Sequence, residues 1–300
     1  QVKTVEYDRD RNGNPFIDKI LQLVTQSKND IQVTKAAAQR IESISAKKNC
    51  KVKQGSLSAF AHMLNYTCPK QITLHISSNP NHFPELLPLV QILACKEIKL
   101  WLLLDHLYFK TSQGEDDSIL VPLQNNDKCK TVQFLGRLGQ AGLEGLPRSL
   151  EVCALRIKPA HVPTLNTTLT AMPDLWHLGI ALDATNNPPV ESIPTLRYGG
   201  KELYLDIDCS IGDNEVAYAV ALVAILCPRG RNTCEWISFW NTHLTSVGAT
   251  RLLEELHDRG LNVIEYVGIQ SKVQITQDQT TELNTMAKAF DLKKVVIAKW

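Results

Sequence analysis

A six-residue pattern with apolar residues at its fourth and sixth positions, and in most copies also at its first, recurs along this chain of 300 residues. Successive copies start at intervals of about 28 residues, which is a period typical of stacked supersecondary units. This period constrains the fold more than any local motif, because it predicts the same short element many times over. The copies are Gln71-x-x-Leu74-x-Ile76, Cys95-x-x-Ile98-x-Leu100, Cys129-x-x-Val132-x-Phe134, Leu150-x-x-Cys153-x-Leu155, Leu175-x-x-Leu178-x-Ile180, Gly200-x-x-Leu203-x-Leu205, Cys234-x-x-Ile237-x-Phe239, Leu261-x-x-Ile264-x-Tyr266 and Leu292-x-x-Val295-x-Ile297.

The residues after the Cys234 copy predict the second half of a repeat, an amphipathic helix. Thr245 is a suitable N-cap, because its hydroxyl oxygen can accept hydrogen bonds from the free amides of the first turn. Gly260 follows at the place where such a helix would end. The predicted inner face consists of apolar residues at helical spacing: Ala249, Leu252, Leu253 and Leu256.

One strand and one helix cannot bury their apolar faces alone, but stacked neighbours form a continuous core. We therefore predict an α/β solenoid with parallel strands on a concave face and helices on a convex face. The alternative is an ordinary doubly wound α/β domain, which also alternates strands and helices. That alternative gives no reason for a shared residue template.

The stretch from Leu244 to Leu256 resembles the helical half of a ribonuclease-inhibitor-type leucine-rich repeat. Its form is similar to the C-terminal repeats of NOD-like receptors, the cytosolic nucleotide-binding sensors of innate immunity. The resemblance covers residues 49–300 and implies a leucine-rich-repeat horseshoe. The chain departs from the family three positions after the last apolar residue of each copy, where Asn or Cys is usual: it has Lys158, Asp183, Asp208, Thr242, Ile269 and Trp300.

Residues 1–48 do not fit the pattern and predict a helical N-terminal cap or linker region, whereas residues 49–300 hold the irregular repeats. Val33, Ala37, Ile41 and Ile44 give one apolar helical face. A cap of this kind would cover the open end of a solenoid core. Residues 104–128 contain the largely polar stretch Thr111–Lys128, which predicts a loop insertion between two copies.

The overall charge gives no support for a nucleic-acid or membrane partner, because 32 basic residues offset 31 acidic ones to a formal net charge of +1. The longest apolar run, from Val216 to Cys227, is about half of the roughly 20 residues that span a bilayer. No secretory leader pattern is present. We therefore expect a cytoplasmic location.

The cysteines are spread evenly and form no C-x-x-C pair. Several fall where the repeat requires a small buried residue, which favours free thiols in a reducing compartment. The alternative is a secreted protein with paired cysteines, and the glycosylation acceptor triplets that begin at Asn65 and Asn166 favour it. The eight cysteines are Cys50, Cys68, Cys95, Cys129, Cys153, Cys209, Cys227 and Cys234.

Motifs for catalysis are absent from the sequence. It has no H-E-x-x-H, no G-x-S-x-G and no phosphate-binding G-x-x-x-x-G-K-[ST]. The close carboxylates of Asp206-x-Asp208 and Glu115–Asp117 fall on a predicted strand and a predicted loop, where we expect no metal site. His177 is interpreted as a surface histidine at a concave position. We expect no catalytic residue, no metal ion and no cofactor.

Side chains alternate along a strand, so the residues between the apolar positions of the pattern face the predicted concave surface. There, Tyr204, Trp236 and Trp240 form an aromatic patch with an acidic edge. Exposed aromatic rings beside charge are typical of protein-binding hot spots. The predicted partner-binding residues are Glu202, Tyr204, Asp206, Trp236, Trp240 and Glu265. Ser238, Val263 and Val267 complete the predicted concave positions, and Lys99 and Trp101 form a second candidate.

These observations predict a non-catalytic protein-interaction or ligand-sensing region. The resemblance implies a cytosolic NOD-like receptor, whose repeats would bind a protein or a microbial or endogenous ligand on the concave face. The nucleotide-binding module of the same receptor is a further possible partner. Two alternatives stay open: a stand-alone ribonuclease-inhibitor-like scaffold that regulates a cytosolic partner, and an extracellular host-defence repeat protein.

Overall fold

The structure is a computed structural model that describes residues 4–7, 43–46, 71–76, 91, 99–104, 120–186, 188–227, 233–261, 264–292 and 294–299. The chain divides into two units. The first comprises Gln1–Leu155 with Ala171–Asp174, and the second Arg156–Thr170 with Leu175–Trp300. All residues of the predicted partner-binding set belong to the second unit.

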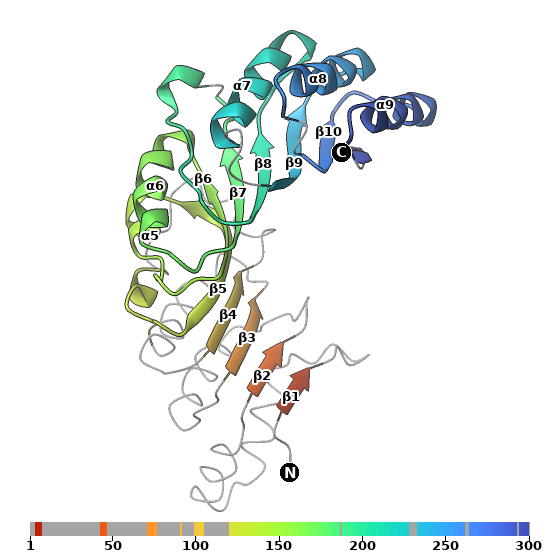
Figure 1. Cartoon of the computed structure of the whole chain (residues 1–300). Coiled ribbons are helices and arrows are strands. Elements are labelled where there is room, and N and C mark those ends of the chain that lie inside the picture. Colours follow the sequence, from red (N-terminus) through yellow and green to blue (C-terminus); the bar gives the residue numbers. More distant parts are fainter. Residues whose placement is uncertain are drawn as a thin grey trace, which may run out of the picture. The chain divides into compact units, whose positions relative to one another are not determined.

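The first unit is built on parallel strands that follow one another in chain order (Figure 1). Gln71 in β3 lies opposite Lys99 in β4, and Leu102 in β4 lies opposite Val132 in β5. The copies of the pattern at Gln71 and Cys129 therefore begin at the first residues of strands, whereas the copy at Cys95 begins before its strand. The strands are β1 (Thr4–Tyr7), β2 (Ser43–Ala46), β3 (Gln71–Ile76), β4 (Lys99–Leu104) and β5 (Cys129–Leu138).

The strands β1 and β2 differ from the helical cap predicted for residues 1–48. Both lie inside that range, and Ile44 of the predicted helical face lies in β2 opposite Val5. A four-residue strand offers too few positions for a period of two to be distinguished from a helical period. The parallel strands therefore start before residue 49. The other residues of the predicted cap lie outside the described part of the chain.

The loop insertion predicted for residues 104–128 ends in regular structure. The 3-10 helix η3 (Val121–Leu123) precedes β5, and Leu120 and Leu123 are fully buried. It packs against α5 (Gln140–Glu144). The two leucines place residues 120–123 in the core, so this end of the segment is not a solvated loop. Residues 105–119 lie outside the described residues.

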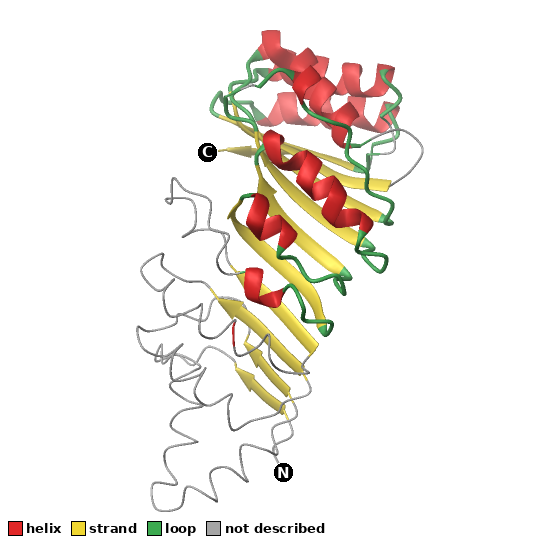
Figure 2. Cartoon of the chain, turned by 90° about the vertical axis from the view of Figure 1, so that its left-hand side faces the viewer, coloured by secondary structure: helices red, strands yellow, loops and turns green. Residues whose placement is uncertain are grey.

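The second unit alternates parallel strands with helices (Figures 1 and 2). Its strands pair in chain order from β7 to β11. Both views place α7, α8 and α9 on one side of these strands, and we call the other side the open face. The elements are the end of β6 (Val152–Ile157), α6 (Val162–Thr170), β7 (His177–Asp183), β8 (Glu202–Asp208), α7 (Val216–Leu226), β9 (Thr233–Thr242), α8 (Ser246–Asp258), β10 (Tyr266–Ser271), α9 (Gln277–Ala289) and β11 (Lys294–Lys299).

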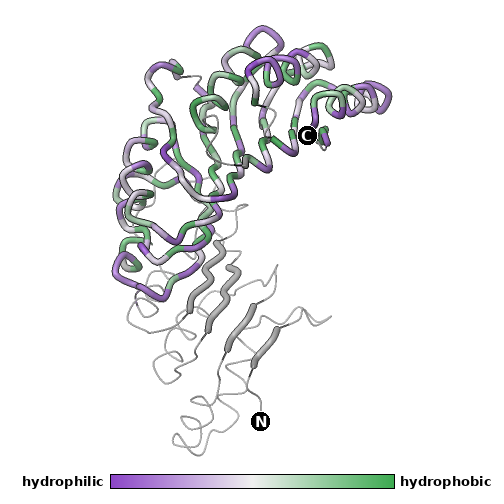
Figure 3. The backbone as a smooth tube through the Cα atoms, in the orientation of Figure 1, coloured by the Kyte–Doolittle hydropathy of each residue, from purple (hydrophilic) through white to green (hydrophobic). Residues whose placement is uncertain are grey.

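The core of this unit lies between the strands and the helices. In β8, Leu203, Leu205 and Ile207 are fully buried, while the residues between them are partly exposed. Helix α7 is almost continuously apolar (Figure 3), and it packs against α8. Its larger aliphatic side chains are mostly buried, whereas Ala217 is exposed. The fold is therefore α/β with parallel strands, and it is compatible with a solenoid.

Helix α8 forms as the sequence predicts. The side chain of Thr245 accepts hydrogen bonds from the backbone N–H groups of Val247 and Gly248, and it is the N-cap. The helix ends at Asp258, and Gly260 follows with φ +64°, a conformation that favours glycine. The predicted inner-face residues are all buried: Ala249, Leu252, Leu253 and Leu256.

The frame predicted for β10 is wrong. The copy Leu261-x-x-Ile264-x-Tyr266 placed Tyr266 in the core and Val267 on the concave surface, but Val267 is fully buried and Tyr266 is partly exposed. Val267 lies opposite Ile237, and Tyr266 lies opposite Trp236. The pattern also fits three residues later, as Ile264-x-x-Val267-x-Ile269, and pairing with β9 selects that frame.

Candidate functional site

The open face of the second unit carries the strand residues that alternate with the core. Glu202, Tyr204, Asp206 and Asp208 on β8 are all partly exposed. Tyr204 lies opposite Trp236 on β9, and Trp236 lies opposite Tyr266 on β10. The sheet register therefore brings together residues that are far apart in the sequence, and it does so on the face that the alternation predicted.

Aromatic rings line the beginning of these strands. Trp236 and Tyr266 are stacked with their ring centroids 5.9 Å apart, and His177 lies 4.7 Å from Tyr204. The ring of Trp176 meets His177 edge-on at 5.7 Å, and Trp176 is 42% exposed. We call this set of five residues the aromatic row: Trp176, His177, Tyr204, Trp236 and Tyr266.

A bulge in β9 adds a carboxylate to the aromatic row. Leu203 pairs with Cys234 and Tyr204 with Trp236, so Glu235 has no partner residue in β8. The hydroxyl of Tyr204 donates a hydrogen bond to Oε2 of Glu235. Bulges of this kind reorient side chains near functional sites. The sequence pattern has no position for Glu235, which is why it was not predicted.

Two further glutamates act on the same phenol. The hydrogen bond to Glu235 raises the pKa of Tyr204 to about 12, with smaller contributions from burial and from the negative charges of Glu235, Glu202 and Glu265. Glu202 also contacts His177, whose Nδ1 lies 3.0 Å from its Oε2. The aromatic row therefore has a rim of three carboxylates, Glu202, Glu235 and Glu265, two of which were predicted.

The next residues along the strands form a chain of hydrogen bonds. Nε1 of Trp240 donates to Oγ of Ser238 over 2.6 Å, and Ser238 donates to Oδ1 of Asp206. Ser238 is 5% exposed, although it was predicted at a concave position. Trp240 and Asp206 therefore lie on the predicted face, but their polar atoms hold neighbouring strands together.

A buried ionic network lies at the ends of β6, β7 and β8. Nη2 of Arg156 is 2.8 Å from Oδ2 of Asp208 and 3.9 Å from Oδ2 of Asp183. Nδ2 of Asn241 donates to Oδ1 of Asp208. Asp183 and Asp208 occupy positions where the resembling family has Asn or Cys, and here they receive a cation instead. The two aspartates stood out in the sequence because they depart from the family pattern, but their partner Arg156 was not predicted.

Five of the six predicted partner-binding residues lie in β8 and β9 on the open face: Glu202, Tyr204, Asp206, Trp236 and Trp240. Glu265 lies directly before β10, and its charge acts on Tyr204. Val267, predicted beside it on the concave surface, is buried instead. Val263 lies outside the described residues. Lys99 and Trp101 lie in β4 of the first unit, and their side chains lie outside the described part. His177 was interpreted as a surface histidine without a role in the site. In the structure it contacts three members of the site: Trp176, Tyr204 and Glu202.

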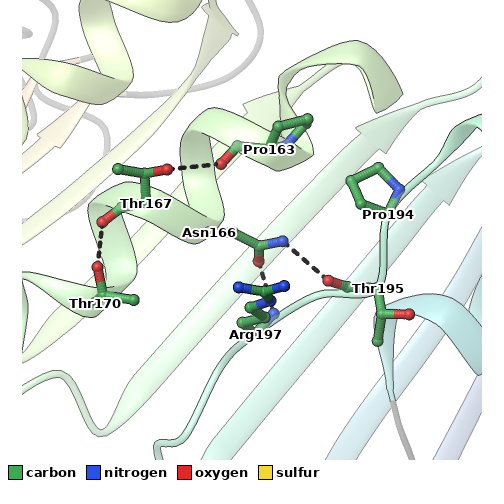
Figure 4. A pocket seen from close by; sticks show the side chains of 7 residues that line it. All are labelled: Pro163, Asn166, Thr167, Thr170, Pro194, Thr195 and Arg197. Atoms are coloured by element: carbon green, nitrogen blue, oxygen red, sulfur yellow. Dashed lines mark hydrogen bonds between the residues drawn. The ribbon is translucent and has the colours of Figure 1, made fainter.

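A pocket of about 560 Å³ lies between α6 and residues 194–197 (Figure 4). Nδ2 of Asn166 donates to the carbonyl of Thr195 over 2.9 Å, and its Oδ1 accepts from the backbone N–H of Arg197 over 2.6 Å. Thr167 and Thr170 donate to carbonyls of their own helix. These polar groups satisfy the protein itself, so we assign no ligand to this pocket. Asn166, which begins the second glycosylation triplet, is itself buried.

The described cysteines are free thiols, and all are buried: Cys129, Cys153, Cys209, Cys227 and Cys234. Burial raises the pKa of Cys129 and of Cys209 to about 12, which removes the reactive thiolate at neutral pH. Among the residues that the structure describes, no group of three or more His, Cys, Asp or Glu side chains could hold a metal ion. Within the same residues, no helix has the length and apolar character to cross a membrane.

No protein-family model matches the chain, and no curated protein is significantly similar to it in sequence.

Proposed function

We propose that this chain is a non-catalytic interaction region of the leucine-rich-repeat class that binds a protein partner through the aromatic row. The observation that carries this proposal is the position of the row: five rings span neighbouring strands on the open face, with a carboxylate rim. Partly exposed Trp and Tyr rings bury large areas on binding at a low cost in conformational entropy.

The repeat resemblance extends this proposal to a cytosolic NOD-like receptor. Its support is the repeated strand and helix, the capped helix α8 and the parallel pairing in chain order. The free, buried thiols favour a reducing, cytoplasmic setting. The partner would be a protein, a microbial or endogenous ligand, or the nucleotide-binding module of the same receptor.

A stand-alone scaffold of the ribonuclease-inhibitor type is the second proposal, because the aromatic row would serve either protein equally well. The extracellular alternative has less support. A secreted protein of this kind would have disulfides, but the described cysteines are free thiols. A glycan at Asn166 would be attached to the amide nitrogen, which here donates a hydrogen bond to the carbonyl of Thr195.

The test is covalent capture of a partner by the full chain. Wild type, Trp236→Ala and the control Arg251→Ala, on the exposed side of α8, are crosslinked in cell extract and compared by mass spectrometry. We expect a protein that wild type and the control retain and Trp236→Ala loses, with similar thermal midpoints for all three. A captured protein that Trp236→Ala retains in full would argue against binding at the aromatic row.

A further inference from the structure

The rim of the aromatic row concentrates negative charge at one place on the open face. Glu235 accepts from the Tyr204 hydroxyl, and Glu202 and Glu265 lie close enough for their charges to act on the same phenol. Within β7, β8, β9 and β10, the one basic residue is His177, which contacts Glu202, and the exposed Lys201 precedes β8. Three carboxylates therefore lie beside aromatic rings on strands whose one basic residue is a histidine.

The rings beside these carboxylates favour a flat cation. A cation over the face of Trp or Tyr is attracted by the ring quadrupole, and the attraction strengthens as water is removed. A guanidinium group stacks on a ring while its edge donates to carboxylates. A lysine ammonium cannot do both, because it is compact and strongly hydrated. The chemistry at Tyr204, Trp236 and Tyr266 therefore fits arginine better than lysine.

The extent of the row indicates how the arginine is presented. The row crosses β7, β8, β9 and β10, and neighbouring strands lie about 4.8 Å apart, so it is about 14 Å long. An extended segment of roughly four residues covers this length. Alternate side chains of such a segment point the same way, so one or two arginines can reach the row together.

We propose that the aromatic row and its rim of Glu202, Glu235 and Glu265 bind arginine side chains of an extended, basic segment of a protein partner. This inference rests on the proposed function and specifies the chemistry of the partner. Aromatic stacking supplies the contact area, and the three carboxylates supply the selectivity for positive charge.

The experiment uses the full chain and a short, blocked, fluorescent peptide of alternating glycine and arginine, followed by anisotropy. The same peptide with citrulline, which keeps the planar group and removes the charge, is the matched probe. We expect the arginine peptide to bind about tenfold more tightly than the citrulline peptide, since charge-assisted hydrogen bonds are replaced by neutral ones. Its affinity should also fall as salt is added.

Variants locate the binding. Glu235→Gln keeps an acceptor for the Tyr204 hydroxyl and removes one charge, so it should weaken arginine binding several-fold while the fold is retained. Glu254→Gln makes the same change on the exposed side of α8 and should leave binding unchanged. Equal affinity for the citrulline and arginine peptides, or an unchanged affinity in Glu235→Gln, overturns the proposal.

Failure of this inference differs from failure of the proposed function. If the arginine peptide does not bind, but a captured partner still depends on Trp236, the arginine chemistry is refuted and the interaction region stands. If the peptide does not bind and no partner depends on Trp236, both are refuted. Tighter binding of a glutamate-containing peptide would also refute the arginine chemistry.

Discussion

Gly248 is the third residue of α8, where alanine ordinarily stabilises a helix by about 0.5–1 kcal/mol relative to glycine. We expect Gly248→Ala to destabilise this protein instead. A Cβ at Gly248 would lie 1.9 Å from Oδ1 of Asp213. That carboxylate holds the N-cap: its Oδ1 accepts from the backbone N–H of Thr245 over 2.9 Å, and its Oδ2 accepts from Oγ1 of Thr245 over 2.6 Å.

The magnitude follows from these contacts. To make room for the methyl group, the Asp213 carboxylate must move by roughly 1.5 Å, which takes both bonds to Thr245 out of hydrogen-bonding range. Hydrogen bonds to a charged group contribute about 1.5–3 kcal/mol each, and these are partly exposed, so their combined loss is about 2–4 kcal/mol. The helix gains about 0.5–1 kcal/mol from alanine. The net destabilisation is therefore about 1–3 kcal/mol.

Urea unfolding of the full chain, followed by tryptophan fluorescence, measures this effect. Gly199→Ala is the control, because a Cβ there meets nothing within 4 Å. In an Asp213→Ala background the clash with the carboxylate is absent and a 3.0 Å contact with Cδ2 of Leu244 remains, so Gly248→Ala should lose its destabilising effect. The resulting coupling energy of about 2–4 kcal/mol identifies the Asp213 contact as the cause. If Gly248→Ala stabilises the wild-type chain, or has the same effect in both backgrounds, the reasoning is refuted.

Three further predictions concern other parts of the second unit. Arg156→Met should cost about 3 kcal/mol in urea unfolding, because it leaves the buried carboxylate of Asp183 and the partly exposed carboxylate of Asp208 without their cation, whereas Arg251→Met breaks an exposed pair and should cost less than about 0.5 kcal/mol. Because the pKa of Tyr204 is raised to about 12, its contribution to stability is complete below pH 10 and is lost as the pH rises through 12. Glu235→Gln should lower the pKa of Tyr204; a pH titration of phenolate absorbance measures it, and Tyr204→Phe identifies the signal of this tyrosine. Asn166→Ala removes two hydrogen bonds and should cost about 1–3 kcal/mol in the same urea assay; an unchanged midpoint would show that solvent replaces them.

The parts of the fold that the sequence predicted are those that depend on local spacing. Thr245 precedes helix α8 and Gly260 follows it. Both ends could be predicted because a capping hydroxyl and a left-handed glycine act on residues only a few positions away. The frame of β10 could not be predicted in this way, because the segment from Leu261 to Ile269 fits the pattern twice. Hydrogen bonding to β9 chooses between the two frames, and that is a contact between distant segments.

The same distinction applies to the site. Glu202, Tyr204 and Trp236 could be placed on one face by alternation, since Glu202 and Tyr204 alternate with the buried residues of β8, and Trp236 comes after the bulge, directly before the buried Ile237. Tyr266 was missed with the frame of β10. Glu235 was missed because a bulge inserts a residue that no periodic pattern counts.

Irregular pairing in β9 is what adds polar groups to the open face. At its start, the bulge directs Glu235 to the hydroxyl of Tyr204. At its end, the register against β10 shifts again, and Asn241 adopts φ +60°, a left-handed conformation that asparagine tolerates better than most residues. Its amide donates to Asp208. In a strand with regular pairing, side chains would alternate between the two faces throughout, and neither Glu235 nor Asn241 would be directed to β8. The two irregularities in the pairing of β9 therefore build both ends of the polar surface around the aromatic row.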